Sequence, residues 1–137
     1  MTFPLIDSDI LIDVLRKDSV ATASFRTLLT EGPVAISVIS RMETIRGCRD
    51  RESQQQAERL RKQLELVGLD ARISARADEL ITRYFLSHNI AVPDALIAAT
   101  ALAYNLPLLT KNQRDFRFLP GLKLLPYPPV VPIAPAA

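Results

Sequence analysis

The sequence predicts an α/β domain built on a parallel sheet. Short apolar runs alternate with longer stretches that carry a helical stripe of apolar residues. Acidic or polar residues stand where the apolar runs pass into helices, as is typical of open α/β sheets. A length of 137 residues with 48% hydrophobic content fits one domain with a packed core.

The first quarter of the chain predicts two strands with two helices between them. Thr2–Ile6 is a short apolar run that ends at acids, and Val34–Val38 is a compact β-branched run. The helices between them are expected over 10–17 and 19–31, and Gly32 is the expected stop.

The middle of the chain is more polar. Ser40–Glu43 is expected to open a helix with Met42 and Ile45 on its buried side. The segment 46–66 is interpreted as a solvated helix or helical hairpin. A short strand is expected over 65–69, and Asp70 is expected to cap a helix over 71–87.

The stretch 92–110 organises the rest of the chain. Pro93 stands where the first turn of a helix tolerates proline, and nearly every residue of 96–102 is apolar or small, so the helix should be mostly buried. A turn at Asn105 leads into an interior strand over 106–109.

The remaining residues add a loop and a tail. We expect a loop or one helical turn over 110–118 and an edge strand over 122–125. Five of the twelve residues in 126–137 are proline, so this tail is expected to be extended or disordered. The folded domain is accordingly expected over 1–125.

Composition excludes several classes of site. The single cysteine, Cys48, excludes an internal disulfide, and the single histidine, His88, argues against a histidine-rich metal site or a Ser-His-Asp triad. We interpret Cys48 as packed and His88 as a helix-end residue. We find no 18-residue apolar run and no signal-peptide pattern, so we expect a cytoplasmic protein without a membrane partner.

Four regions place acids at the end of a strand or the start of a helix. Each acid has a structural explanation as well as a functional one: a helix cap, a Ser-x-x-Glu capping box, a favourable dipole contact or an ordinary loop acid. The residues are Asp7 with Asp9, Glu43 after Ser40, Asp94, and Asp115 with Asn112.

Taken together, these acids indicate a metal site. The carboxyl ends of parallel strands meet at one edge of a sheet, so the carboxylates would converge there and repel one another. A hard cation such as Mg²⁺ or Mn²⁺ relieves that repulsion. It also activates water and stabilises charge on a phosphodiester during hydrolysis.

Four blocks of the sequence resemble the PIN-domain ribonucleases, and most closely the VapC toxins of bacterial toxin–antitoxin pairs. The resemblance spans about residues 3–125 and follows the order and spacing of that family. The blocks are Leu5–Ile12, Ser37–Gly47, Pro93–Ala101 and Leu109–Phe116.

This resemblance implies a three-layer α/β/α sandwich around a central, mostly parallel sheet of four or five strands. It also implies a Mg²⁺-dependent endoribonuclease, with Mn²⁺ as a possible substitute. The implied partners are an RNA substrate, with transfer RNA and ribosomal RNA both plausible, a second copy of the chain in a homodimer, and a neutralising VapB antitoxin.

The resemblance assigns the metal-binding acids by position. Asp7, Glu43 and Asp94 match the first, second and third acids of the family. The fourth is either Asp115 or Asn112, which stands where many relatives have an acid. Asp7 and Asp94 would hold Mg²⁺, while Glu43 and Asp115 would hold a second ion or orient the attacking water.

Other residues are expected around these acids. Cationic side chains after the Glu43 helix and after the strand 106–109 are candidates to bind RNA phosphates, whereas the charges of 51–62 are better explained as a solvated helix face. The expected lining residues are Ser8, Asp9, Thr110 and Asn112, and the expected RNA-binding residues are Arg46, Arg49, Lys111 and Arg114.

Two other functions were weighed. A haloacid-dehalogenase-type phosphatase also begins with a strand and Asp-x-Asp, but its pattern has Thr or Val where Leu11 stands and gives Glu43 no role. A non-catalytic partner in a toxin–antitoxin complex is disfavoured by the intact acids. The apolar residues Leu11, Leu15, Phe25 and Leu28 serve either the core or an interface with a dimer mate or antitoxin.

Overall fold

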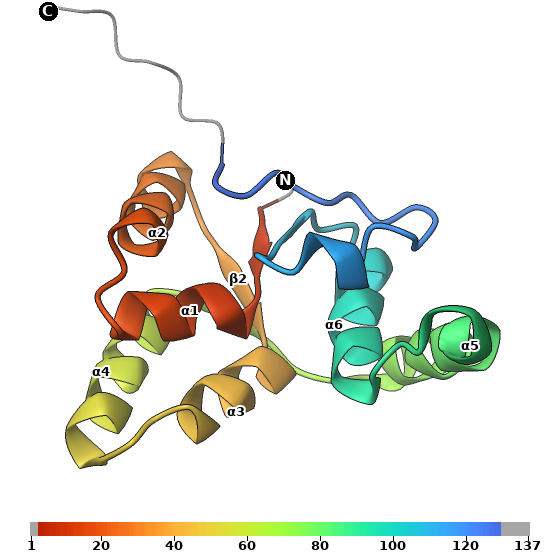
Figure 1. Ribbon diagram of the computed structural model, residues 1–137, viewed down its shortest axis with the longest axis horizontal. Helices are drawn as coiled ribbons and strands as arrows, with labels where there is room; N and C mark the ends of the chain where they lie inside the picture. Colours follow the sequence, from red (N-terminus) through yellow and green to blue (C-terminus); the bar gives the residue numbers. More distant parts are fainter. Residues whose placement is uncertain (1–2, 130–137) are drawn as a thin grey trace, which may run out of the picture.

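The computed structural model describes residues 3–129 and is built around a sheet of parallel strands (Figure 1). Within these residues the sheet has four strands in the order β3-β2-β1-β4. All neighbouring strands run parallel, which confirms the predicted fold class. The strands are β1 Leu5–Ile6, β2 Ala35–Ser37, β3 Glu65–Val67 and β4 Leu108–Leu109.

Helices cover both faces of the sheet. Figure 1 shows α1, α2 and α4 on one side and α5 and α6 on the other, with α3 beyond the carboxyl ends of the strands. This arrangement is the expected three-layer sandwich. The helices are α1 Ser8–Leu15, α2 Ser19–Glu31, α3 Val38–Arg46, α4 Arg51–Lys62, α5 Ala71–His88 and α6 Val92–Ala103, and a 3₁₀ turn, η1, covers Gln113–Asp115.

Successive strand residues point into two different cores. Leu5 and Leu108 pack with α5 and α6, whereas Ile6 and Leu109 pack with α1 and α2. Because side chains alternate along a strand, a sheet covered on both faces needs apolar residues at every position. That requirement explains why these strands read as continuous apolar runs.

The apolar residues of the first two helices belong mainly to the core. Leu11, Phe25 and Leu28 are buried in the cluster beneath α1 and α2. Leu15 is only half-buried and lines a surface cleft. Packing in the core, rather than contact with another chain, therefore accounts for three of these four side chains.

The strand order creates a switch point between β1 and β4. The chain moves outward from β1 to β2 and β3, then returns to place β4 on the other side of β1. The Asp7 amide donates a hydrogen bond to the Leu109 carbonyl at 2.9 Å. A crevice outside the carboxyl ends of β1 and β4 is where ligands bind in such sheets.

Several local predictions are confirmed. Asp70 is the N-cap of α5 and accepts a hydrogen bond from the Ile73 amide at 2.9 Å. Helix α2 has the predicted bounds and stops at Gly32. Asn105 adopts the left-handed conformation (φ 52°), and this turn after α6 directs the chain toward β4.

The predicted start of α3 is wrong. The helix begins at Val38, because the Ser37 hydroxyl accepts a hydrogen bond from the Ile39 amide and acts as the N-cap. Ser40 therefore lies inside the helix and forms no capping box with Glu43. The predicted burial of Met42 is wrong as well, because Met42 is 48% exposed, while Ile45 is half-buried.

The predicted edge strand over 122–125 is also wrong. Only a single bridge joins Leu124 to Leu108. The Leu125 carbonyl, the next acceptor along this pairing, accepts a hydrogen bond from the Gln113 side-chain amide at 3.1 Å. Similarly, Phe3 and Pro4 precede β1 rather than belonging to it, and Thr2 lies outside the described residues.

The proline-rich segment predicted over 126–137 is described only as far as Pro129, and the remainder lies outside the described residues. Tyr127 packs against the core beneath α1 and α2. Across the described part of the chain, no helix is both long and apolar enough to cross a membrane.

Register partners on β2 and the edge strand β3 differ strongly in burial, so we expect them to differ in their contribution to stability. Ile36 and Leu66 are register partners, but Ile36 is 1% exposed and Leu66 is 39% exposed. Ile36→Ala should lower the free energy of unfolding by about 2–5 kcal/mol, because it leaves a cavity. Leu66→Ala is the matched control and should cost less than about 1 kcal/mol. Urea denaturation measures both, and equal losses would contradict this description of the core.

Candidate active site

The predicted acids approach one another at the switch point, beginning with Asp7. Asp7 follows β1 directly and is the N-cap of α1, where its Oδ1 accepts a hydrogen bond from the Ser8 amide at 2.7 Å. Its carboxylate is buried, with only 6% of the residue exposed. Asp7 thus caps the helix and also stands where β1 and β4 end side by side, so both explanations of this acid apply.

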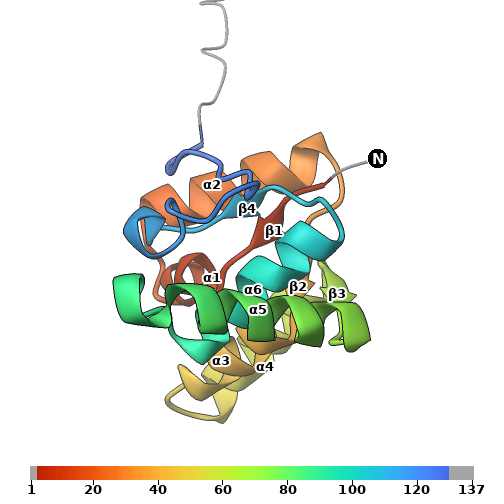
Figure 2. The same ribbon diagram turned by 90° about the vertical axis from the view of Figure 1, so that its right-hand side faces the viewer.

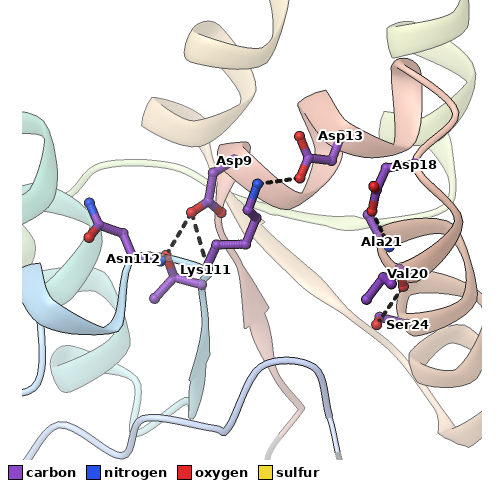
Figure 3. A network of polar contacts seen from close by, with 9 residues as sticks. Asp9, Asp13, Asp18, Val20, Ala21, Ser24, Lys111 and Asn112 are labelled. Atoms are coloured by element: carbon purple, nitrogen blue, oxygen red, sulfur yellow. Dashed lines mark hydrogen bonds and ion pairs between the residues drawn. The ribbon is translucent and has the colours of Figure 1, made fainter.

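Thr110 joins the end of β4 to two of the acids. Its hydroxyl lies 2.8 Å from Oδ2 of Asp7 and 3.1 Å from Oδ2 of Asp9. Asp9 also accepts a hydrogen bond from the Lys111 amide at 3.1 Å (Figure 3). These contacts fix the carboxylates of Asp7 and Asp9, at the start of α1, against the loop that follows β4.

Glu43 reaches the same region from α3. Its Oε1 accepts a hydrogen bond from the Ser8 hydroxyl at 3.1 Å. The Ser40 hydroxyl, one turn earlier on α3, lies 3.5 Å from Oδ1 of Asp7. The contact with Ser8 replaces the capping role that the sequence suggested for Glu43 and directs its carboxylate to the crevice.

Asp94 and Asp115 form the far side of the site. Asp94 lies in the first turn of α6, where no side chain caps the helix, and it lines a cleft together with Asp115 from η1. The Asn112 amide donates a hydrogen bond to Oδ2 of Asp115 at 2.5 Å. Asn112 therefore orients Asp115 with its amide nitrogen.

The close approach of these acids changes their protonation. Burial, and then the negative charge of Asp9, raises the pKa of Asp7 to about 7. Burial raises the pKa of Asp94 to about 6, with smaller contributions from the negative charges of Asp115, Glu43 and Asp9. The pKa of Asp9 is also raised, chiefly by burial. The carboxylates thus disfavour one another's ionised forms when no cation is bound.

This donor set suits a hard divalent cation. The Oδ1 atom of Asp9 is buried without a hydrogen-bond partner among the described residues, so an acceptor is left free beside Asp7. Within residues 3–129, however, no three acidic, histidine or cysteine side chains are close enough to hold an ion alone. Mg²⁺ commonly keeps several waters, so carboxylates at this spacing fit an ion bound partly through water.

The predicted RNA-binding cations separate into two groups. Lys111 forms an ion pair with Asp13 beside Asp9 (Figure 3). Arg114 lines the cleft that contains Asp94 and Asp115. Arg49 instead lines a different cleft, bounded by α1 and the turn after α3. Arg46 is exposed at the last position of α3.

Three polar residues around the site were missed in the sequence. Asp13 holds the Lys111 ammonium group, and Gln113 donates hydrogen bonds to the carbonyls of Thr110 and Leu125. Ser40 was interpreted only as a cap. Asp13 and Gln113 carry no motif, and their roles depend on contacts between distant parts of the chain, so no local signal identifies them.

A family model for the PIN domain matches residues 5–121. The chain therefore belongs to the PIN domain family. Within that family it is similar to proteins named ribonuclease VapC. Ribonuclease VapC10 of Mycobacterium tuberculosis is 38% identical over 120 residues, covering 87% of this chain and 90% of that protein. Ribonuclease VapC1 of Methanocaldococcus jannaschii is 33% identical over 124 residues, covering 88% and 85%.

Solved structures show the same fold. A toxin–antitoxin complex from Klebsiella pneumoniae contains a chain 29% identical to this one, with a TM-score of 0.71 and coverage of 87% of this chain and 94% of that one. The VapBC2 structure from Rickettsia felis, bound to a promoter DNA fragment, matches at 23% identity with a TM-score of 0.75 over 90% of this chain and 97% of that one.

Ribonucleases of the PIN family generally depend on a divalent metal ion. Membership in this family excludes the phosphatase alternative.

The raised pKa values predict a pH-dependent stability of the metal-free protein. The pKa of Asp7 rises from 3.8 in the unfolded chain to about 7 in the fold, so the folded state holds an extra proton between these values. Stability should therefore fall as the pH rises from about 4 to 7. Asp7→Asn removes this titration and should raise the Tm at pH 8 by about 3–5 °C for each kcal/mol recovered.

Thermal melting with and without Mn²⁺ or Mg²⁺ completes this test. The cation should raise the Tm of the wild type more at pH 8 than at pH 5, because protons compete with the metal for the carboxylates. The variant Asp78→Asn changes an exposed acid of α5 and is the control. A Tm for the wild type that is insensitive to both pH and cation would contradict this account of the site.

Proposed function

We propose that this chain is a Mg²⁺-dependent endoribonuclease toxin of a type II toxin–antitoxin pair, with Mn²⁺ as a possible substitute. The observation that carries the proposal is the convergence of acids from separate segments on the switch point of the sheet, where burial and mutual repulsion raise the pKa of Asp7 and Asp94. The similarity to relatives named ribonuclease VapC supports RNA as the substrate.

We assign Asp7 and Asp94 to direct or water-mediated binding of the ion, and Glu43 and Asp115 to a second ion or to the attacking water. A bound divalent ion lowers the pKa of water and stabilises charge on the phosphodiester. The neighbouring hydroxyls keep the acids in place: Thr110 holds Asp7, and Ser8 holds Glu43.

Asp115, rather than Asn112, is the fourth acid in this proposal. The negative charge of Asp115 contributes to the raised pKa of Asp94, and both residues line the same cleft, which supports this assignment. The amide nitrogen of Asn112 is engaged by Asp115, so we assign Asn112 a positioning role. Asp9 adds a further carboxylate beside Asp7. Through its contact with Thr110, it also keeps the loop after β4 against α1.

Lys111 and Arg114 are the best placed cations for RNA phosphates, because the Lys111 amide contacts Asp9 and Arg114 lines the same cleft as Asp94 and Asp115. Phosphate contacts supply affinity and register without reading sequence. Arg46 and Arg49 lie farther along α3 and its following turn, and we assign them to the outer part of the RNA path. Transfer RNA and ribosomal RNA both remain candidate targets.

The proposed partners are a VapB-type antitoxin and a second copy of the chain. The structural similarity to toxin–antitoxin complexes supports the antitoxin. A cytoplasmic location agrees with an RNA substrate and with a single free cysteine. Expression of the wild-type chain without its antitoxin is expected to arrest growth.

Cleavage of RNA by the purified chain tests the proposed function. Asp7→Asn and Asp94→Asn should each lower the cleavage rate at least about 100-fold, because loss of supporting residues around a metal site already costs about 10–100-fold. EDTA should abolish cleavage, and Asp78→Asn should cleave like the wild type. Equal cleavage by all samples would point to a contaminant, whereas no cleavage of a broad RNA panel would favour a non-catalytic binding partner.

A comparison of Asp115→Asn with Asn112→Ala tests the fourth ligand. Asp115→Asn should lower cleavage at least about 100-fold, whereas Asn112→Ala should lower it about tenfold, as for a residue that only positions a ligand. Raising the Mn²⁺ concentration should rescue Asn112→Ala more than Asp115→Asn. The reverse order of losses would assign the ligand to Asn112.

A further inference from the structure

A cleft of about 330 Å³ opens directly beside the acids of the site. The end of α5 and the start of α6 form one wall, and η1 with the residues after it forms the other; Figure 2 shows these segments on the same side of the molecule. Asp94 and Asp115 lie within its lining, so the cleft is continuous with the proposed catalytic centre. Its volume lies at the small end of the range of ligand sites, which suits about one nucleotide.

Two stacked aromatic rings line the cleft. The imidazole of His88 lies over the ring of Phe118 with a centroid distance of 3.9 Å and an interplanar angle of 8°. Tyr84 supports Phe118 edge-on at 5.5 Å and 60°. His88 is exposed and Phe118 is half-buried, so the pair presents a flat aromatic surface to the solvent. Tyr84 supports this surface from below through Phe118.

Polar groups complete the surroundings of this aromatic surface. Arg114 supplies a guanidinium group to the same cleft, and Asn89 follows His88 in a left-handed conformation (φ 51°) as the C-cap of α5. Ile90 is buried beneath them. A flat ring surface, a nearby cation and an amide for base edges are the features with which proteins hold unpaired nucleotides of RNA.

A purely structural role explains only part of this arrangement. The stacking on Phe118 ties the end of α5 to the chain after η1, but that function needs neither an exposed histidine nor an arginine in the same cleft. Phe85, on the same helix, is 52% exposed and lies outside the cleft lining. The joint presence of ring, cation and cleft therefore distinguishes His88 from an ordinary exposed aromatic residue.

We propose that this cleft binds one unpaired nucleotide of the RNA adjacent to the scissile phosphate, with its base stacked on His88 and a phosphate held by Arg114. The inference rests on the proposed function for the identity of the polymer. It makes His88 and Phe118 determinants of cut-site preference, and it requires the RNA to be single-stranded at the cut.

Binding can be measured without cleavage. A single-stranded RNA oligonucleotide with 2-aminopurine at successive positions is added to the Asp7→Asn chain, and fluorescence quenching reports stacking of that base. One position should be quenched, and His88→Ala in the same background should abolish the quenching and weaken binding about tenfold, the effect of losing one stacked base. His88→Phe should restore both, and Phe85→Ala should change neither.

The cut-site distribution of the active chain supplies the second readout. His88→Ala should broaden the distribution, and His88→Phe should retain it. Arg114→Ala should weaken RNA binding more than Arg117→Ala, which removes an exposed arginine outside the cleft lining.

These outcomes separate the inference from the proposed function. Cleavage of RNA with quenching and cut sites unaffected by His88→Ala would overturn the nucleotide site and leave the nuclease intact. Quenching that depends on His88 in a chain that cleaves no RNA would support the nucleotide site and overturn the nuclease. Absence of quenching at every position of the oligonucleotide would overturn the nucleotide site.

Discussion

The hydroxyl of Thr110, hydrogen-bonded to the carboxylate of Asp7, is the contact on which the site depends. It joins residues 103 positions apart in the sequence at the switch point between β1 and β4. The same hydroxyl lies within reach of Asp9, so one side chain sets the spacing of two acids. Because β1 and β4 are buried on both faces, the strands that carry these groups have little freedom to shift. The position of the acids is therefore a property of the core as much as of the loops.

The fold was largely predictable because its signals are local. Asp70 caps the start of α5, Gly32 ends α2, and Asn105 turns the chain toward β4. Each of these signals comes from the chemistry of a single residue. The error at the start of α3 arose because two local signals competed. Ser37 and Ser40 are both good caps, and only the end of β2 decides that the helix begins after Ser37.

The meeting of the acids was also predictable, since parallel strands end at one edge of a sheet. Their partners were not. The hydrogen bond from Ser8 to Glu43 and the ion pair of Lys111 with Asp13 depend on how α1 is placed against α3 and against the loop after β4. Such contacts between distant segments leave no pattern in the sequence. The stacking of His88 on Phe118 was equally unpredictable, because it joins the end of α5 to the chain after η1, two segments that are distant in the sequence.

The late position of β4 in the chain has a consequence for biosynthesis. This strand pairs with β1 and is the last in the strand order of the described sheet, and it is translated after every α-helix and after the other three strands described here. A nascent chain that ends before Leu108 lacks one of the two strands that pair with β1, as well as Thr110 and Asp115. An incomplete product on the ribosome therefore lacks an assembled acidic centre, and these acids come together only after Asp115 has been translated.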